Sequence, residues 1–126
     1  MSILGIDIGT TTITALLLDE KHGKIINKTT LKNESFIDSN FDFEKIQDPD
    51  IIIETVKKAI NEITDGTDIS SIGVTGQMHG ILYLDNENYP VSPLYTWQDL
   101  RGNEIYKGTF SYADYLNETT NYKSAT

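Results

Sequence analysis

The residues best suited to bind a phosphate come early in the chain, in the string DIGTTT that begins at Asp7. A carboxylate buried at the end of a strand needs a partner, because burying an uncompensated charge is costly. A Mg²⁺ ion, bound directly or through water, would supply that partner. Gly9 allows a tight turn, after which the backbone N–H groups and the hydroxyls of Thr10, Thr11 and Thr12 can face a phosphate. The string therefore predicts a phosphate and metal site, although an ordinary hairpin with an aspartate in a polar turn also fits it.

A second candidate site is the string GQMHG at residues 76–80. Glycine on either side lets the chain turn sharply and present the side chains between on one edge. Gln77 and His79 can hydrogen-bond to hydroxyl groups, and Met78 can pack against a carbon skeleton. These properties suit a polyol or a sugar. A β-hairpin with an incidental histidine is the alternative.

A third candidate is the string TWQDLR at residues 96–101. Trp97 offers an apolar face on which a sugar ring can lie, and Gln98, Asp99 and Arg101 are polar partners for hydroxyls. In the structural alternative Trp97 is a core residue, Asp99 caps a helix and Arg101 forms a surface ion pair. Taken alone, the string favours this structural interpretation.

Three strands with short connections are expected to position the first string. Residues 2–9 form an apolar run that ends at glycine, which suits a buried strand. Residues 12–19 begin with β-branched side chains and predict a second strand. Residues 24–32 are more polar and predict an outer third strand. Because the links are short, we expect an antiparallel meander.

A helix is the clearest element of the middle of the chain. Residues 33–47 are too apolar for a free linker and predict an ordered surface loop. Asp48 is a suitable N-cap, Pro49 fits the first helical position, and apolar residues then recur at helical spacing until Gly66.

Further strands are expected beyond this helix, over residues 71–75 and 81–85. A short helix is expected from Leu100, whereas residues 109–126 are polar and rich in tyrosine without clear periodicity. The predicted order is β-β-β-α-β followed by extra elements, which indicates an α/β fold.

Composition excludes several kinds of function. The chain has 126 residues and a formal charge of −9, too acidic for a nucleic-acid or anionic-membrane partner. It has no cysteine, which removes disulfides, thiolate nucleophiles and cysteine-ligated zinc. No apolar run approaches the roughly 20 residues of a membrane helix. A cytoplasmic protein is therefore expected.

Taken together and in this order, the strings resemble the FGGY family of carbohydrate kinases. GIDIGTTT is similar to the family's first phosphate loop, GQMHG to kinases of the xylulokinase type, and Ile46-Gln47-Asp48-Pro49 to an E-Q-D-P motif, with isoleucine in place of glutamate. TWQD-x-R resembles W-N-D-x-R. Gln98, the preceding Leu-Tyr-Thr-Trp run and the terminal Tyr-Lys-Ser-Ala-Thr favour sedoheptulokinase-like members. The resemblance covers nearly all of residues 3–126.

The resemblance implies transfer of a phosphoryl group from Mg-ATP to a ketose. Asp7 would hold Mg²⁺, and the loop of Gly9 and the three threonines would bind the phosphates. Gln77, Met78 and His79 would bind the sugar, with Trp97 and Asp99 nearby. The implied fold is the ribonuclease-H-like fold of actin, hexokinase and heat-shock chaperones.

The resemblance also implies that residues 1–126 are part of an N-terminal domain. Members of the family are several times longer and carry their catalytic aspartate and most of the adenine site downstream. We therefore expect a kinase fragment, inactive alone, without a catalytic base in this chain.

Two alternatives remain open. A chaperone-type or actin-type ATPase shares the first string but needs neither GQMHG nor TWQD. A non-catalytic half-domain could bind a sugar or a partner strand, and its exposed strand edges would favour a homodimer. The sequence does not distinguish xylulose, ribulose and sedoheptulose as the sugar.

Overall fold

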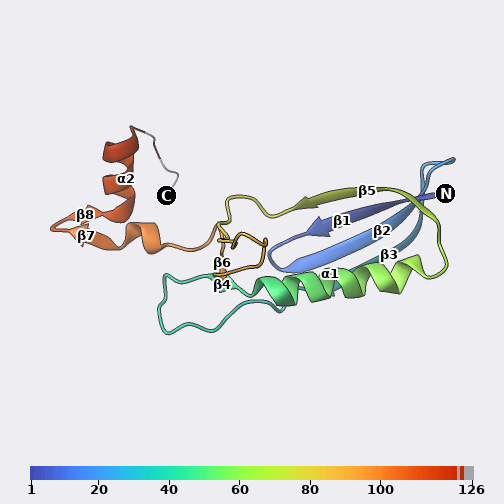
Figure 1. Ribbon diagram of the computed structural model, residues 1–126, viewed down its shortest axis with the longest axis horizontal. Coiled ribbons are helices and arrows are strands. Elements are labelled where there is room, and N and C mark those ends of the chain that lie inside the picture. The colour runs from blue at the N-terminus through green and yellow to red at the C-terminus, as the bar shows by residue number, and fades with distance from the viewer. Residues whose placement is uncertain (122, 124–126) are drawn as a thin grey trace.

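The computed structural model describes residues 1–121 and 123, and its larger part is a mixed sheet covered on one face by a helix (Figure 1). Strands β1 (Ser2–Ile8), β2 (Thr12–Asp19) and β3 (Lys24–Lys32) form the expected antiparallel meander. Gly23, at a positive φ of 63°, closes the turn between β2 and β3.

Helix α1 (Pro49–Thr64) begins where the sequence predicts. The side chain of Asp48 accepts hydrogen bonds from the N–H groups of Asp50 and Ile51, and so caps the first turn. Gly66 follows the helix at a positive φ of 66°. The chain then enters β5 (Ile69–Gly76), which pairs in parallel with β1 and gives the sheet order β3-β2-β1-β5. The predicted β-β-β-α-β order is confirmed, with one short strand inserted before the helix.

The hydrophobic core lies between α1 and one face of the sheet. Alternate residues of β1 and β2 point toward the helix, as the period of two requires, and α1 presents side chains at helical spacing. The buried core comprises Leu4, Ile6, Ile13, Ala15, Leu17, Ile52, Ala59 and Ile63.

A second, smaller sheet lies beside the end of the first. It pairs β4 (Ile46–Gln47) with β6 (Leu94–Tyr95), so part of the loop predicted over residues 33–47 is a short strand. The strand predicted over residues 81–85 is wrong. Only isolated bridges form there, because Ile81 pairs with Tyr95 and no continuous partner strand runs alongside among the described residues.

The last described segment forms an arm that extends away from the main sheet (Figure 1). The helix expected from Leu100 is a single 3₁₀ turn, η1 (Arg101–Asn103). After it come the hairpin strands β7 (Ile105–Lys107) and β8 (Phe110–Ser111), and then α2 (Tyr112–Thr120), which the sequence pattern missed. Ser111 and Asp114 form a capping box at the start of α2.

Two further expectations from the sequence concern the C-terminal residues and membrane-spanning helices. The terminal Tyr-Lys-Ser-Ala-Thr string falls on residues 122–126, of which the structure describes only residue 123. Among the described residues, no helix has the length and apolarity that crossing a membrane requires.

The packing predicts a sharp difference between two apolar residues of the meander. Leu17 is 2% exposed beneath α1, whereas Ile25 on β3 is 61% exposed. Leu17→Ala should lower the free energy of unfolding by about 2–5 kcal/mol because it leaves a cavity. Ile25→Ala should change it by less than about 1 kcal/mol. Urea unfolding of the two variants measures both values, and equal losses would contradict this assignment of the core.

Candidate active site

The parallel pairing of β1 with β5 places two loops side by side. Ile8 ends β1 opposite Gly76, which ends β5, and the pairing continues with a hydrogen bond of 2.9 Å from the N–H of Gln77 to the carbonyl of Ile8. A Cβ atom at Gly76 would lie 2.8 Å from that carbonyl oxygen, so the close approach requires glycine. The DIGTTT and GQMHG loops therefore leave the sheet at the same edge.

Every backbone carbonyl of the loop after β1 is turned toward a protein donor. The donors, in loop order, are Asn33 Nδ2 to Gly9 O at 2.9 Å, Gln47 Nε2 to Thr10 O at 2.9 Å, Asn33 N to Thr11 O at 2.8 Å, and Gly9 N to Thr12 O at 3.0 Å. Gly9 is required here, because a Cβ atom would lie 2.8 Å from the carbonyl oxygen of Thr12. The hydrogen bonds that its carbonyl groups accept therefore fix the conformation of this loop.

The backbone N–H donors of this loop are less completely paired than its carbonyl acceptors. Among the described residues, the backbone N–H groups of Thr10 and Thr11 have no hydrogen-bond acceptor. Backbone N–H groups in a turn with no protein acceptor are suited to an anion. The hydroxyl of Thr10, in contrast, is already used: it donates to Gln77 Oε1 at 2.9 Å and accepts from Trp97 Nε1 at 3.1 Å.

A closed ring of side-chain hydrogen bonds lies beneath the two loops. Gln77 Nε2 donates to Gln47 Oε1 at 2.8 Å, Gln47 Nε2 donates to the Thr10 carbonyl, and the Thr10 hydroxyl donates back to Gln77. Gln47 is fully buried and was not among the predicted site residues. Its place in the IQDP string was the available signal, but a single glutamine before a helix cap does not reveal which loops it will bind.

A hollow of about 330 Å³ lies where the two loops meet. It is lined by Asp7, Gly9, Thr10, Gly76, Gln77, Met78, His79 and Trp97. The structure therefore brings together residues from all three predicted strings. Thr11 and Thr12, both exposed, lie outside this lining.

The premise that Asp7 is buried is wrong. Asp7 is exposed, because strand alternation places it on the sheet face opposite Leu4 and Ile6, and α1 covers only the face of those two residues. Its carboxylate therefore lines the hollow rather than the core. Within the described part of the chain, no cluster of three or more acidic or histidine side chains could hold a metal ion without other ligands.

His79 has an unusual backbone conformation. Its φ is 60°, in the left-handed region that non-glycine residues seldom adopt. The turn is completed by Gly80, where a Cβ atom would come within 3.0 Å of Leu94 Cδ1. The exposed side chains of His79 and Met78 both line the hollow. A strained histidine at the edge of a hollow is a feature typical of functional sites.

A second hollow of about 610 Å³ adjoins the first, sharing His79 and Trp97 with it. Tyr83 and Tyr95 form part of its wall, and the arm contributes Tyr112 and Leu116. Trp97 is 56% exposed, so it is not the buried core residue of the structural alternative. Its ring instead lies at the boundary between the two hollows.

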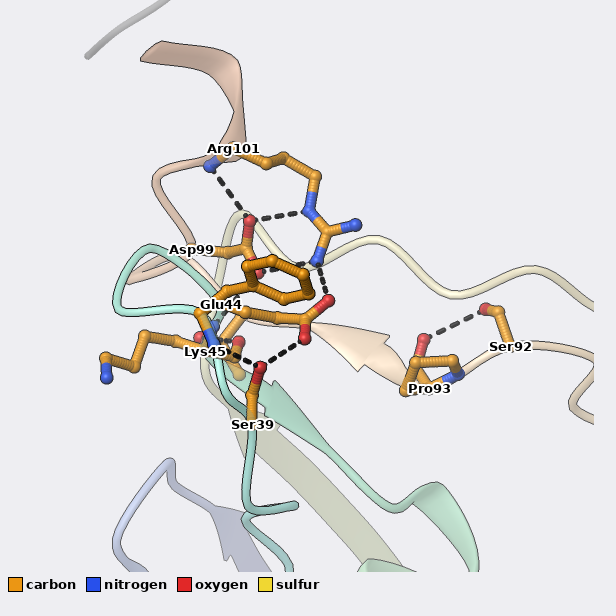
Figure 2. A network of polar contacts seen from close by, with 9 residues as sticks. Ser39, Glu44, Lys45, Ser92, Pro93, Asp99 and Arg101 are labelled. Carbon is orange, nitrogen blue, oxygen red and sulfur yellow. Dashed lines mark hydrogen bonds and ion pairs between the residues drawn. The ribbon is translucent and has the colours of Figure 1, made fainter. Parts of the chain in front are cut away.

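Asp99 lines the second hollow, where it forms a fork-shaped ion pair with Arg101 (Figure 2). Arg101 Nε lies 2.6 Å from Asp99 Oδ1 and Nη2 lies 2.9 Å from Oδ2, and Nη2 also donates to Glu44 Oε1 at 3.0 Å. The guanidinium lies 4.2 Å from the centre of the Tyr95 ring. The ion pair of the structural alternative is thus present.

The charge state of Asp99 reflects two opposing effects. Burial of the carboxylate alone would raise its pKa, but hydrogen bonds from Arg101 and from the backbone N–H of Lys45 outweigh burial and hold the pKa of Asp99 below its usual value. The same pair raises the pKa of Arg101. Both side chains are therefore charged at neutral pH, and they hold the loop before Lys45 against the TWQD segment.

Comparison with known proteins shows the family to which this chain is related. The model of the N-terminal domain of the FGGY family of carbohydrate kinases matches residues 2–121. The chain belongs to the FGGY family. It is 36% identical over 104 residues to a xylulose kinase from Lactococcus lactis and 30% identical over 122 residues to a glycerol kinase from Aquifex aeolicus. These alignments cover 79% and 94% of the chain.

Solved FGGY kinases have the same fold. The structure of a ligand-bound xylulose kinase from Lactobacillus acidophilus superposes with a TM-score of 0.69 and 27% identity, over 78% of this chain and 20% of that one. The expected actin- and hexokinase-like fold is therefore confirmed. The chain spans about a fifth of the length of the curated xylulose kinase from Lactococcus lactis and about a quarter of the glycerol kinase.

The ion pair predicts a pH-dependent stability difference. Asp99→Asn removes the charge that Arg101 binds, and should lower the free energy of unfolding by about 1–3 kcal/mol at pH 7. Because the pKa of Asp99 is lowered by folding, its contribution is present above the unfolded value of about 3.9 and is lost as the pH falls through the folded pKa.

Denaturant unfolding of wild type and Asp99→Asn at neutral and at acidic pH tests this. The difference between the two proteins should shrink as the medium becomes more acidic than the unfolded pKa. A difference that stays constant across this range would show that the ion pair adds no stability.

Proposed function

We propose that the whole protein transfers the γ-phosphoryl group of ATP to a hydroxyl of a ketose, and that residues 1–126 supply its first phosphate loop and part of its sugar site. The observation that carries the proposal is the arrangement at one edge of the sheet. The free N–H groups of Thr10 and Thr11 follow β1, and the hydroxyl-binding candidates of the GQMHG loop follow β5 directly beside them.

The phosphate side fits the chemistry of phosphoryl transfer. Such transfer needs positioning and neutralisation of charge more than covalent chemistry. The N–H groups of Thr10 and Thr11 would donate to phosphate oxygens, and the exposed hydroxyls of Thr11 and Thr12 would add donors. The Thr10 hydroxyl is less suited, because it already bonds to Gln77 and Trp97.

The metal role falls to Asp7, whose exposed carboxylate lines the hollow beside the phosphate loop. Mg²⁺ is usually held by one or two carboxylates together with substrate phosphates and water, so a lone aspartate at this place fits. When bound, Mg²⁺ would neutralise charge on the phosphates. No described residue takes the part of the general base, which we place in another part of the whole protein.

The sugar side is formed by the shared boundary of the two hollows. His79 and the remaining hydrogen-bonding positions of the Gln77 amide would bond to hydroxyls. Met78 and Trp97 would pack against the carbon chain. Asp99 would lie near the sugar while remaining paired to Arg101. Several relatives are xylulose kinases, which favours xylulose over sedoheptulose as the sugar. Use of ATP and a free sugar favours a cytoplasmic location.

A non-catalytic, partner-binding role is the second candidate, and the outer strand favours it. Ile72 and Val74 of β5 are 61% and 65% exposed, and among the described residues no strand pairs with the outer edge of β5. Such an edge pairs readily with another strand, from a second copy or from the rest of the whole protein. Release of ADP in the presence of a ketose would decide for the kinase.

The metal role predicts a specific effect of Asp7→Asn in the whole protein. Turnover should fall by about 100-fold or more, because the charge that holds Mg²⁺ beside the phosphates is lost. The affinity for the sugar should change little. ADP release on a ketose panel measures turnover, with Asp42→Asn as the control, since Asp42 is exposed and lines neither hollow. Unchanged turnover would remove Asp7 from the metal role.

The sugar role predicts an asymmetric effect of His79→Ala. The KM for the sugar should rise by about 10-fold, as for loss of a hydrogen bond to substrate, while the KM for ATP changes much less. His22→Ala is the matched control, because His22 is exposed in the β2–β3 turn and pairs with Asp19, away from both hollows' lining residues. Equal changes in both KM values would argue against a sugar-side position for His79.

A further inference from the structure

Gln47 stands out as a buried polar side chain outside the three strings that carry the predicted chemistry. It is 0% exposed, it belongs to β4, and it comes immediately before the Asp48 cap of α1. A buried amide needs partners for both its oxygen and its nitrogen. Gln47 finds them in two different loops, the phosphate loop and the GQMHG loop.

The directions of these hydrogen bonds leave little freedom. Gln47 must donate to the carbonyl of Thr10 and accept from Gln77, while Gln77 must accept from the Thr10 hydroxyl. The amide at position 47 supplies both the donor and the acceptor that this arrangement needs. Trp97 extends the ring, since its indole N–H donates to the same Thr10 hydroxyl. Four segments distant in sequence are thus connected through one threonine.

Burial makes the connection stiff. Water does not reach Gln47 to replace a lost partner, so a movement of either loop would leave a buried polar atom without a hydrogen bond. The backbone bond from Gln77 to Ile8 connects the loops at the strand ends. Two residues after Ile8, the Thr10 hydroxyl bonds directly to Gln77, and Gln47 bridges the Thr10 carbonyl to the Gln77 side chain. These three connections together restrict both the separation and the relative tilt of the loops.

We propose that Gln47 is a positioning residue that holds the phosphate loop and the sugar loop at the spacing needed for phosphoryl transfer. The proposal rests on the function proposed above for the roles of the two loops. Gln47 itself lines neither hollow and touches no substrate in this arrangement. It acts through Thr10 and Gln77, whose displacement would misalign the attacking hydroxyl and the phosphate.

The first test is Gln47→Met in the whole protein. Methionine has a similar shape but neither donates to Thr10 nor accepts from Gln77. The kcat/KM values for both ATP and the ketose should fall by about 10- to 100-fold, as for a small displacement of reacting groups. Ile63→Val is the control, because Ile63 is buried between α1 and the sheet and has no contact with the ring. It lowers stability and should leave both kcat/KM values close to wild type.

The second measurement needs neither activity nor substrate. The indole N–H resonance of Trp97, identified by its loss in Trp97→Phe, reports the hydrogen bond to Thr10. In Gln47→Met without ligand this resonance should shift and exchange faster with water, and in Ile63→Val it should not. If Gln47→Met does not fold, Gln77→Leu breaks the ring at a half-buried residue other than the partner of the Trp97 indole N–H, and should move the same resonance.

The outcomes separate the two proposals. If wild type phosphorylates no ketose but the Trp97 resonance moves as expected, the kinase function fails and the coupling of the loops stands. If the resonance and the kcat/KM values of Gln47→Met match those of Ile63→Val, Gln47 is only a core residue and the inference is overturned. An unmoved resonance in Gln77→Leu overturns it as well.

Discussion

The parallel pairing of β1 with β5 is the constraint on which the rest of the site depends. Parallel strands end at the same edge of a sheet, so the loops that follow them must lie together. The pairing runs in register to Ile8 and Gly76 and continues through the N–H of Gln77. Without this register the carboxylate of Asp7 and the strained His79 would not line one hollow. The antiparallel meander before β5 and the crossover helix α1 both serve to bring these two strands side by side.

The loops are then held by buried polar groups rather than by apolar packing. Gln47 and Asn33 supply donors to the carbonyls of the DIGTTT loop, whereas the N–H groups of Thr10 and Thr11 have no acceptor among the described residues. A loop whose carbonyl acceptors are satisfied within the protein keeps its shape while its N–H donors remain available. The Asp99–Arg101 pair has a similar structural role beside the second hollow, where it joins the TWQD segment to the loop that carries Glu44 (Figure 2).

Signals from neighbouring residues predicted the helices and strands around the site better than the hydrogen bonds that connect its loops. The Asp48-Pro49 cap and the glycines after β1 and α1 act through neighbouring residues, so they can be recognised in sequence. The strand predicted over residues 81–85 failed because a run of apolar residues forms a strand only where a partner strand lies beside it. Helix α2 was missed because its apolar residues are few, although its Ser111–Asp114 capping box was present in the sequence. The burial expected for Asp7 failed because the sequence does not show which sheet face the helix covers.

The sequence by itself determined the family, the β-β-β-α-β order and the three strings that line the hollows, because each is encoded in residues close together along the chain. The tertiary structure decided which of those residues meet. It placed Thr11 and Thr12 outside the first hollow, committed the hydroxyl of Thr10 to Gln77 and Trp97, and made Gln47 a buried bridge between the loops. These contacts join residues 30 to 87 positions apart. Their partners are selected by the register of β1 with β5 and by the need to satisfy buried amides, and neither can be read from neighbouring residues.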